Sequence, residues 1–151
     1  VLFRSPFKPN YSKISNDIDV NRKLASDLMI YLEKAQLITI LRDNSFGISS
    51  LGKVEKIYLN NTNLSYALVG EMTDIGNARE TVFLSLLNPI YDITSSPHSD
   101  FIVDKKYTFE LGGKNKKQKQ IKDVKDSYLV KDDIEYGSAN IVPLWTFGLL
   151  Y

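Results

Sequence analysis

The chain has 151 residues, of which 43% are hydrophobic and 25% charged, and its formal net charge is +1. These values are ordinary for a globular protein and exclude wholesale disorder, while the absence of cysteine excludes disulfides and zinc–thiolate sites. The single histidine, His98, excludes a metal centre built from several histidines. No apolar run approaches the ~18 residues that cross a bilayer, and no secretory signal pattern occurs, so we expect a cytoplasmic protein without a membrane partner. Because the chain begins with Val1, we also expect it to be a piece of a longer polypeptide.

Residues 1–53 carry two helical patterns followed by a strand pattern. A short helix is predicted over Ser12–Ile18, with Ser12 as its N-cap, and a longer helix over Arg22–Gln36. The apolar positions of the longer helix form one continuous stripe: Leu24, Leu28, Tyr31, Leu32 and Ala35. A strand over residues 37–41 and a polar turn over residues 43–47 follow. Helix, turn, longer helix, strand and hairpin is the order of a winged helix-turn-helix.

In the DNA-reading form of that fold, the front of the second helix enters the major groove. We therefore predict DNA contacts from the residues at this end of the helix: Asn21, Arg22, Lys23 and Ser26. The cations placed to reach phosphates are Lys13, Arg42 and Lys53, whereas Asp27 opposes binding because it repels the DNA backbone. The alternative is that this domain only packs against a neighbouring one, since a fold does not decide function.

Residues 54–151 alternate between strand and helix patterns. Strands are predicted over Val54–Leu59, residues 90–94, Phe101–Val103, Tyr107–Leu111 and Ser127–Lys131. Helices are predicted over Leu64–Val69, Ala78–Leu87, Lys114–Val124 and from Pro143 onward. The helix between the last two strands implies that these strands run parallel. The apolar residues expected in the core are Val82, Leu86, Leu144, Trp145, Phe147 and Leu150, with Phe83 and Leu87 as further candidates on the same helix as Val82. The chain as a whole is predicted to be an α/β protein with two domains, residues 1–53 and 54–151.

The stretch from Asp100 to Lys114 combines a strand hairpin with charged residues. Asp100 precedes the first strand, Glu110 lies near the end of the second, and Lys114 follows two glycines. If the strands pair, both carboxylates lie at one end of the sheet, where two oxygen ligands can hold a hard divalent cation such as Mg²⁺. A nearby ammonium group can orient a water or offset the charge of a phosphate. The alternative is a set of solvated residues that protect a sheet edge.

From Ala78 onward, the predicted order of helix, three strands, helix and strand is similar to the PD-(D/E)XK nuclease core. The segments KIYLNNTNLSYAL, GNARETVFLSLL, DFIVDKKYTFELGGK and IVPLWTFGLLY resemble the C-terminal region of prokaryotic AAA-family ATP-binding proteins. The resemblance implies a winged helix followed by a restriction-endonuclease-like domain of unsettled function, with an ATPase domain upstream in the same chain. ATP would bind only to that upstream domain, because residues 1–151 contain no G-x-x-x-x-G-K-[ST] phosphate loop.

Transferred onto this sequence, the nuclease pattern implies that Asp100 and Glu110 bind Mg²⁺, that Glu80 is the acid of the helix, and that Lys114 is the catalytic lysine. The sequence departs from the pattern at two positions. Gly112 occupies the lysine position of the usual Glu-x-Lys, and Ser99 replaces the proline that commonly precedes the aspartate. Lys114 would therefore have to reach back past two glycines.

Residues 114–125 contain six lysines: Lys114, Lys116, Lys117, Lys119, Lys122 and Lys125. On a helix facing DNA they would neutralise several phosphates, and Lys116, Lys117 and Lys119 are DNA-binding candidates. The alternative is a solvated helix face. Two main functions stay open: an Mg²⁺-dependent nuclease region that binds DNA, and an inactive nuclease-like module that docks onto a protein partner or its own ATPase domain. A third is a winged-helix regulator with an unrelated α/β domain. The oligomeric state does not follow from the sequence.

Overall fold

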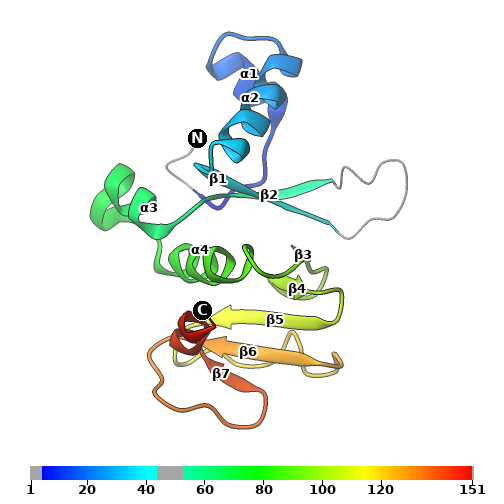
Figure 1. Cartoon of the computed structure of the whole chain (residues 1–151), viewed down its shortest axis with the longest axis vertical. Helices are drawn as coiled ribbons and strands as arrows, with labels where there is room; N and C mark the ends of the chain where they lie inside the picture. The colour runs from blue at the N-terminus through cyan, green and yellow to red at the C-terminus, as the bar shows by residue number, and fades with distance from the viewer. Residues whose placement is uncertain (1–4, 44–52, 151) are drawn as a thin grey trace. The chain divides into compact units, whose positions relative to one another are not determined.

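A computed structural model describes residues 5–43 and 53–150, and the predicted turn at 43–47 therefore lies largely outside the described residues. The chain divides into two compact units, Val1–Thr73 (unit 1) and Asp74–Tyr151 (unit 2). Together they hold a two-stranded sheet, a five-stranded mixed sheet and several helices, which confirms the α/β class (Figure 1). Within the described ranges, no helix is long and apolar enough to cross a membrane.

Unit 1 begins with two helices, each started by an asparagine. Helix α1 spans Tyr11–Asp17 and α2 spans Arg22–Lys34. The N-cap of α1 is Asn10, whose side chain accepts a hydrogen bond from the backbone N–H of Lys13 at 3.0 Å. Asn21 caps α2 in the same way. The prediction of Ser12 as the first cap is therefore wrong, because the earlier Asn10 already satisfies the free N–H groups of the first turn.

The strands of unit 1 explain where the unit ends. Strand β1 (Ile38–Arg42) pairs antiparallel with β2 (Val54–Leu59), and Ile57 also bridges Phe7 at the start of the chain. Helix α3 (Thr62–Val69) and a 3-10 turn, η2 (Gly70–Met72), follow. Because Ile57 and Leu59 belong to the hydrophobic core of unit 1, the division falls after Thr73 and not between residues 53 and 54 as the sequence suggested.

Helix α2 buries a different face from the one predicted. Ala25 and Met29 are the buried residues, whereas Leu24, Leu28 and Tyr31 are 41%, 36% and 60% exposed. The helix has apolar residues on two adjacent faces, and periodicity alone does not say which one meets the core. The small side chain of Ala25 joins the core of Ile14, Ile38 and Ile57, which leaves the predicted stripe largely at the surface.

Unit 2 consists of helix α4 (Ile75–Leu87) and a sheet ordered β3-β4-β5-β6-β7. The strands span Ile93–Ser95, Phe101–Val103, Tyr107–Gly112, Ser127–Lys131 and Ile141–Pro143. Strands β3, β4 and β5 pair antiparallel, whereas β5, β6 and β7 run parallel. The parallel pairing of β5 with β6 is as predicted, but β7 was missed because residues 141–143 are too short to show a strand pattern.

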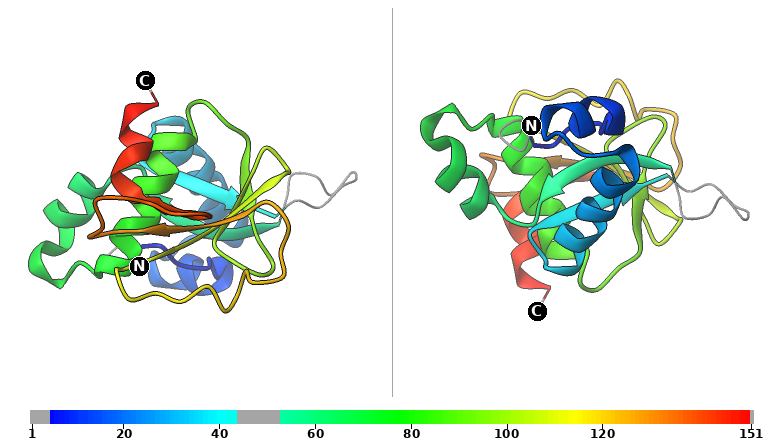
Figure 2. Two further views of the ribbon diagram at one scale, coloured as in Figure 1. Left: turned by 90° about the horizontal axis from the view of Figure 1, so that it is seen from below. Right: turned by 90° about the horizontal axis from the view of Figure 1, so that it is seen from above.

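An aromatic cluster holds the helix against this sheet. The ring of Phe83 on α4 lies 5.3 Å from Phe101, 5.2 Å from Phe109 and 4.9 Å from Phe147, measured between ring centroids. Phe147 belongs to a C-terminal 3-10 helix, η3 (Leu144–Leu149), which runs beside α4 in both views of Figure 2. Each such ring buries a large apolar area, so this cluster fixes how α4 lies relative to β4 and β5.

Three further expectations for unit 2 are wrong. Residues 114–124 form turns instead of a helix, although their backbone is tied to its surroundings. Trp145 is 55% and Leu150 45% exposed, so they lie outside the core. On α4 Val82 and Leu86 are only half-buried, whereas the further candidates Phe83 and Leu87 are buried together with Ala78, Thr81 and Leu84, because the aromatic cluster sets the rotation of the helix.

Candidate functional site

A pocket of about 320 Å³ lies in unit 2, where the carboxyl end of β5 meets the first turns of α4. Its walls combine charged side chains with backbone from a glycine pair. The residues that line it are Gly76, Arg79, Glu80, Asp100, Leu111, Gly112, Gly113 and Lys116. Two predicted site residues, Glu80 and Asp100, therefore lie together in this pocket, and a third, Glu110, precedes one of its walls on β5.

Asp100 is held close to β5 by a backbone hydrogen bond. It directly precedes β4, and its Oδ2 atom accepts a hydrogen bond from the N–H of Leu111 at 2.8 Å. Since Phe101 pairs with Phe109 across the hairpin, Asp100 lies next to the position of Glu110 on the neighbouring strand. The hairpin therefore brings both acids to the same end of the sheet.

Glu110 is a buried carboxylate with one satisfied oxygen. The residue is 2% exposed, and its Oε1 atom lies 2.5 Å from the Nζ atom of Lys116. Its Oε2 atom is buried and has no hydrogen-bond partner among the described residues. An unsatisfied buried carboxylate oxygen is costly, about 1–3 kcal/mol, so this atom requires an explanation.

The lysine in the pocket is Lys116 and not the predicted Lys114. Lys114 is exposed and does not line the pocket, and its carbonyl oxygen accepts a hydrogen bond from Nζ of Lys131 at 2.9 Å. Residues 113–116 form a turn in which the N–H of Lys116 donates to the carbonyl of Gly113 at 2.9 Å. This turn reverses the chain, so the lysine that points back toward Glu110 is two positions later than expected.

Gly112 creates the space through which Lys116 reaches Glu110. A Cβ atom built on Gly112 would overlap the Cβ, Cγ and Cδ atoms of Lys116. The glycine at the position of the Glu-x-Lys lysine thus leaves room for the stem of a lysine from the following loop. In the sequence, the sign that a later lysine replaces the one in Glu-x-Lys was the glycine pair directly before a run of lysines. This pattern does not show which lysine of the run turns inward.

Helix α4 contributes Arg79 and Glu80 to the pocket wall. The Nε atom of Arg79 donates to Oδ2 of Asp132 at 3.0 Å, so this guanidinium group is fixed from the β6 side. Arg79 was not predicted as a site residue. No group of three or more His, Asp or Glu side chains arranged to hold a metal ion occurs among residues 5–43 and 53–150.

The candidate DNA contacts of unit 1 are distributed around its two helices. Lys13, Arg22 and Lys23 are exposed, whereas Ser26 is half-buried. Asn21 is exposed, but its side chain is engaged as the cap of α2. The structure thus leaves three cations of this set at the surface.

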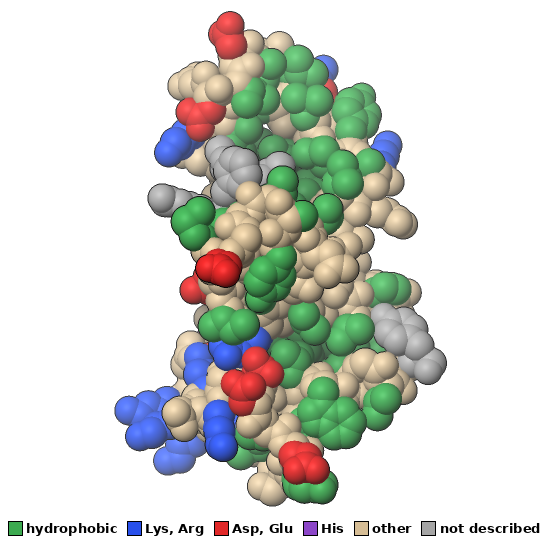
Figure 3. Space-filling model, turned by 90° about the vertical axis from the view of Figure 1, so that its left-hand side faces the viewer, with side chains coloured by type: hydrophobic (Ala, Val, Ile, Leu, Met, Phe, Trp, Pro, Cys, Tyr) green, Lys and Arg blue, Asp and Glu red, His purple; other side chains and the backbone are tan. Residues whose placement is uncertain are grey.

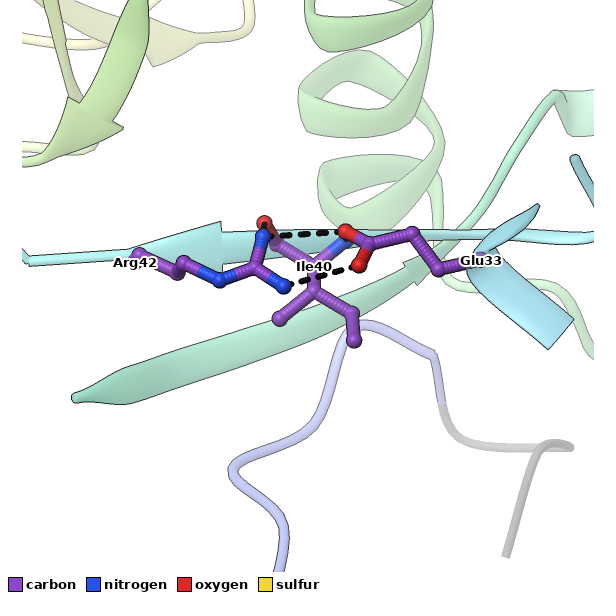
Figure 4. A network of polar contacts seen from close by, with 3 residues as sticks. All are labelled: Glu33, Ile40 and Arg42. Atoms are coloured by element: carbon purple, nitrogen blue, oxygen red, sulfur yellow. Dashed lines mark hydrogen bonds and ion pairs between the residues drawn. The ribbon is translucent and has the colours of Figure 1, made fainter. Parts of the chain in front are cut away.

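Arg42 is held by an acid of its own unit. Its Nη2 and Nη1 atoms lie 2.7 Å and 3.0 Å from the two carboxylate oxygens of Glu33, which also accepts a hydrogen bond from the N–H of Ile40 (Figure 4). The hydrogen bond with Glu33 raises the pKa of the Arg42 guanidinium group. This clamp joins α2 to β1, so Arg42 has a structural contact within unit 1. Lys53, a further predicted phosphate contact, has its Nζ atom 3.7 Å from Oε1 of Glu55.

The remaining DNA candidates, Lys117 and Lys119, are exposed in the loop between β5 and β6, whereas Lys116 turns toward Glu110.

Comparison of the chain with protein-family models, with curated proteins and with solved structures found no match.

Proposed function

We propose that unit 2 hydrolyses phosphodiester bonds in DNA with the help of a divalent cation, and that its fold is a variant of the PD-(D/E)XK nuclease core. The order and directions of the strands support this proposal, because an antiparallel β3-β4-β5 meander followed by a parallel β6 agrees with the strands that the sequence resemblance implies, although turns replace the implied helix between β5 and β6. The pocket supports it too, because it combines Glu80 and Asp100 with Lys116 and lies next to Glu110.

The single observation that carries the proposal is the unpaired Oε2 atom of Glu110. A carboxylate that is 2% exposed and has one oxygen without a partner is well suited to a bound cation. Mg²⁺ in proteins is commonly bound by one or two carboxylates, with waters and substrate phosphate completing its coordination. Glu110 and Asp100 would therefore suffice to hold it, without a third acidic ligand.

In the proposed reaction, Asp100 and Glu110 would hold Mg²⁺, which when bound would supply activation of the attacking water and stabilisation of the charge that develops on the phosphate. Lys116 would hold a phosphate oxygen with its ammonium group, which Glu110 already orients. Glu80, which also lines the pocket, would accept a proton from the attacking water as the new P–O bond forms, and the leaving alkoxide would take a proton from solvent as the old P–O bond breaks. Arg79, fixed by Asp132, would add a second positive charge near the scissile phosphate.

Nicking of supercoiled plasmid DNA tests this proposal. The wild-type protein is expected to nick in Mg²⁺ or Mn²⁺ and to stop in EDTA. Asp100→Asn keeps an acceptor for the N–H of Leu111 but lowers the ligand charge, so nicking is expected to disappear while the fold persists. Asp92→Asn, at an exposed carboxylate outside the pocket and outside residues 113–126, is the matched control and is expected to nick normally. Nicking that survives Asp100→Asn contradicts the proposal.

A second candidate function, docking onto a protein, is favoured by the surface of α2. Leu24, Leu28 and Tyr31 are exposed and lie at the spacing of one helix face. Such an apolar face suits a protein partner better than DNA, because the grooves of DNA are lined mainly by polar groups. The exposed charges of α2 are Arg22, Lys23 and Lys34, since Glu33 is engaged by Arg42. The partner that fits is an amphipathic helix with an apolar face and acidic flanks, such as one on an upstream ATPase domain.

The two roles of α2 are separable by substitution. Arg22→Ala with Lys23→Ala is expected to weaken duplex DNA binding if unit 1 is a DNA-reading winged helix. Leu28→Ala with Tyr31→Ala is expected to leave DNA binding unchanged and to weaken binding of a synthetic helical peptide with leucines on one face and glutamates on the other. Failure of the wild-type protein to bind that peptide contradicts the docking function.

A further inference from the structure

The connection between β5 and β6, residues 113–126, carries six lysines but only two acids, Asp123 and Asp126. We refer to it as the lysine loop. Lys116 turns inward to Glu110, whereas the other five lysines are exposed: Lys114, Lys117, Lys119, Lys122 and Lys125. In the part of unit 2 drawn in the lower half of Figure 3, basic side chains gather in one group beside acidic ones.

Although it lacks regular secondary structure, the lysine loop is anchored at several points. Ile121 is 1% exposed, so the middle of the loop is fixed in the core. The hydroxyl of Ser127 donates to the carbonyls of Ile121 at 3.0 Å and Val124 at 2.7 Å. The side-chain amide of Gln118 donates to the side chain of Asn140 at 2.7 Å. The exposed lysines are therefore presented from a backbone of defined shape.

None of the five exposed ammonium groups forms an ion pair with an acid of the described chain. Like charges grouped on one short loop repel one another, and the two acids of the loop balance only part of this charge. An anionic ligand would offset it. Because the lysines are spread along the whole loop instead of converging on one point, they fit a polymer with repeating charges better than a single phosphate ion.

The start of the lysine loop coincides with the pocket. Gly113 and Lys116 line the pocket together with Asp100 and Glu80, and Lys117 follows directly. A phosphodiester backbone bound along the loop would therefore lead to the carboxylates. We infer that the lysine loop binds the sugar–phosphate backbone of a nucleic acid and delivers it to the pocket. This inference rests on the proposed function, because it takes the substrate of that site to be a nucleic acid.

Binding of a fluorescently labelled duplex DNA, measured by anisotropy in EDTA over a series of salt concentrations, tests the inference separately from hydrolysis. Lys117→Gln, Lys119→Gln and Lys122→Gln are combined in one variant. Each phosphate contact contributes about 0.9 to the slope of log K against log salt, so this variant is expected to lose about tenfold or more in affinity and to show a flatter slope. The same three positions changed to arginine are expected to keep the affinity.

The matched control removes the same charge from exposed lysines that lie outside the lysine loop and outside the predicted DNA contacts, through Lys34→Gln, Lys105→Gln and Lys106→Gln. A larger loss of DNA affinity in the loop variant than in the control variant supports the inference. Equal losses of affinity in the two variants would mean that only net charge matters, and would overturn it. Equal binding of the loop variant and the wild type to DNA also overturns it. Vesicles of phosphatidylserine serve as a second anionic ligand. If the protein binds these vesicles through the lysine loop but does not bind DNA, the ligand of the loop is a membrane surface and the inference is overturned. The Asp100→Asn variant is expected to bind DNA normally, so lost binding and lost nicking are distinguishable.

Discussion

The Nζ atom of Lys116 lies 2.5 Å from Oε1 of Glu110, and the stem of the lysine reaches it by passing over Gly112. The carboxylate is almost fully buried, whereas the lysine is partly open to the pocket. The lysine at the mouth of the pocket thus reaches the buried acid through the space left by the missing side chain of Gly112. This relationship makes the site depend on a glycine as much as on its charged residues.

Gly112→Ala is expected to destabilise the protein by about 1–3 kcal/mol, because the added methyl group overlaps the Lys116 stem in a well-packed region. Gly113→Ala is the control, since its Cβ would lie 3.3 Å from the end of the flexible Arg79 side chain. Urea unfolding of both variants measures the difference. Equal stability of the two variants would show that Lys116 does not follow this path.

A double-mutant cycle on Glu110 and Lys116 measures their coupling. Lys116→Met leaves the carboxylate of Glu110 buried without its cation, with an expected cost of about 1–3 kcal/mol. Adding Glu110→Gln to that variant is expected to recover part of the loss, because the uncompensated charge is removed. The free energies of unfolding of the four proteins give the coupling, and strictly additive effects would show that the pair is not formed.

The rotation of α2 is tested by substitutions at two adjacent residues. Met29→Ala is expected to cost about 2–5 kcal/mol, because Met29 is 7% exposed and its removal leaves a cavity. Leu28→Ala is expected to cost less than about 1 kcal/mol, because a third of this side chain already meets solvent. Thermal or urea unfolding compares them. A larger loss of stability from Leu28→Ala than from Met29→Ala would show that the helix face predicted from the sequence is the one that packs against the core.

The Lys8–Glu55 ion pair gives unit 1 a small dependence on acid pH. The hydrogen bond from Lys8, at 2.8 Å, lowers the pKa of Glu55 below its ordinary value of 4.5. The stabilisation is therefore present above pH 4.5 and is lost as the pH falls through the lowered pKa of the folded state. Because Lys8 is largely exposed, the effect is expected to be about 0.2–1 kcal/mol and to shrink in high salt.

Unfolding measured across that acid range in wild type and Glu55→Gln isolates this contribution. The variant is expected to show the flatter pH dependence, with the two proteins converging at the acid end. Glu71→Gln, at an exposed carboxylate, is the control and is expected to follow the wild type. If the free energy of unfolding of Glu55→Gln changes with pH in parallel with that of the wild type, the ion pair is not the cause of the pH dependence.

Local sequence signals predicted the elements whose structure depends on near neighbours. The strand pattern of residues 101–111 gave the hairpin, and Asp104 and Lys105 adopt left-handed backbone conformations in its turn. The helix predicted over Leu64–Val69 corresponds to α3, which begins two residues earlier, at Thr62, after its cap Asn61. These features are stabilised within a few residues, so the sequence contains most of the information that they need.

The features that failed depend on distant contacts. Lysine and glutamine are good helix formers, yet residues 114–124 are not helical, because Ile121 and the hydroxyl of Ser127 fix them in turns. The choice of Lys116 over Lys114 follows from the same turns. For α2, two apolar faces compete and the core selects the one with Ala25. Asp100 and Glu110 were named from the hairpin alone, but no local signal showed that one of them would be buried.

The most direct test of the central claim is Mn²⁺ binding followed by paramagnetic broadening in the amide NMR spectrum of the isotope-labelled protein. We expect the signals of Asp100, Leu111 and Gly112 to broaden first, because these residues surround the two carboxylates. In the Glu110→Gln variant that broadening is expected to require much more Mn²⁺. Broadening confined to exposed acids such as Asp17 and Asp133, with unchanged signals from the end of β5, would contradict a cation site between Asp100 and Glu110.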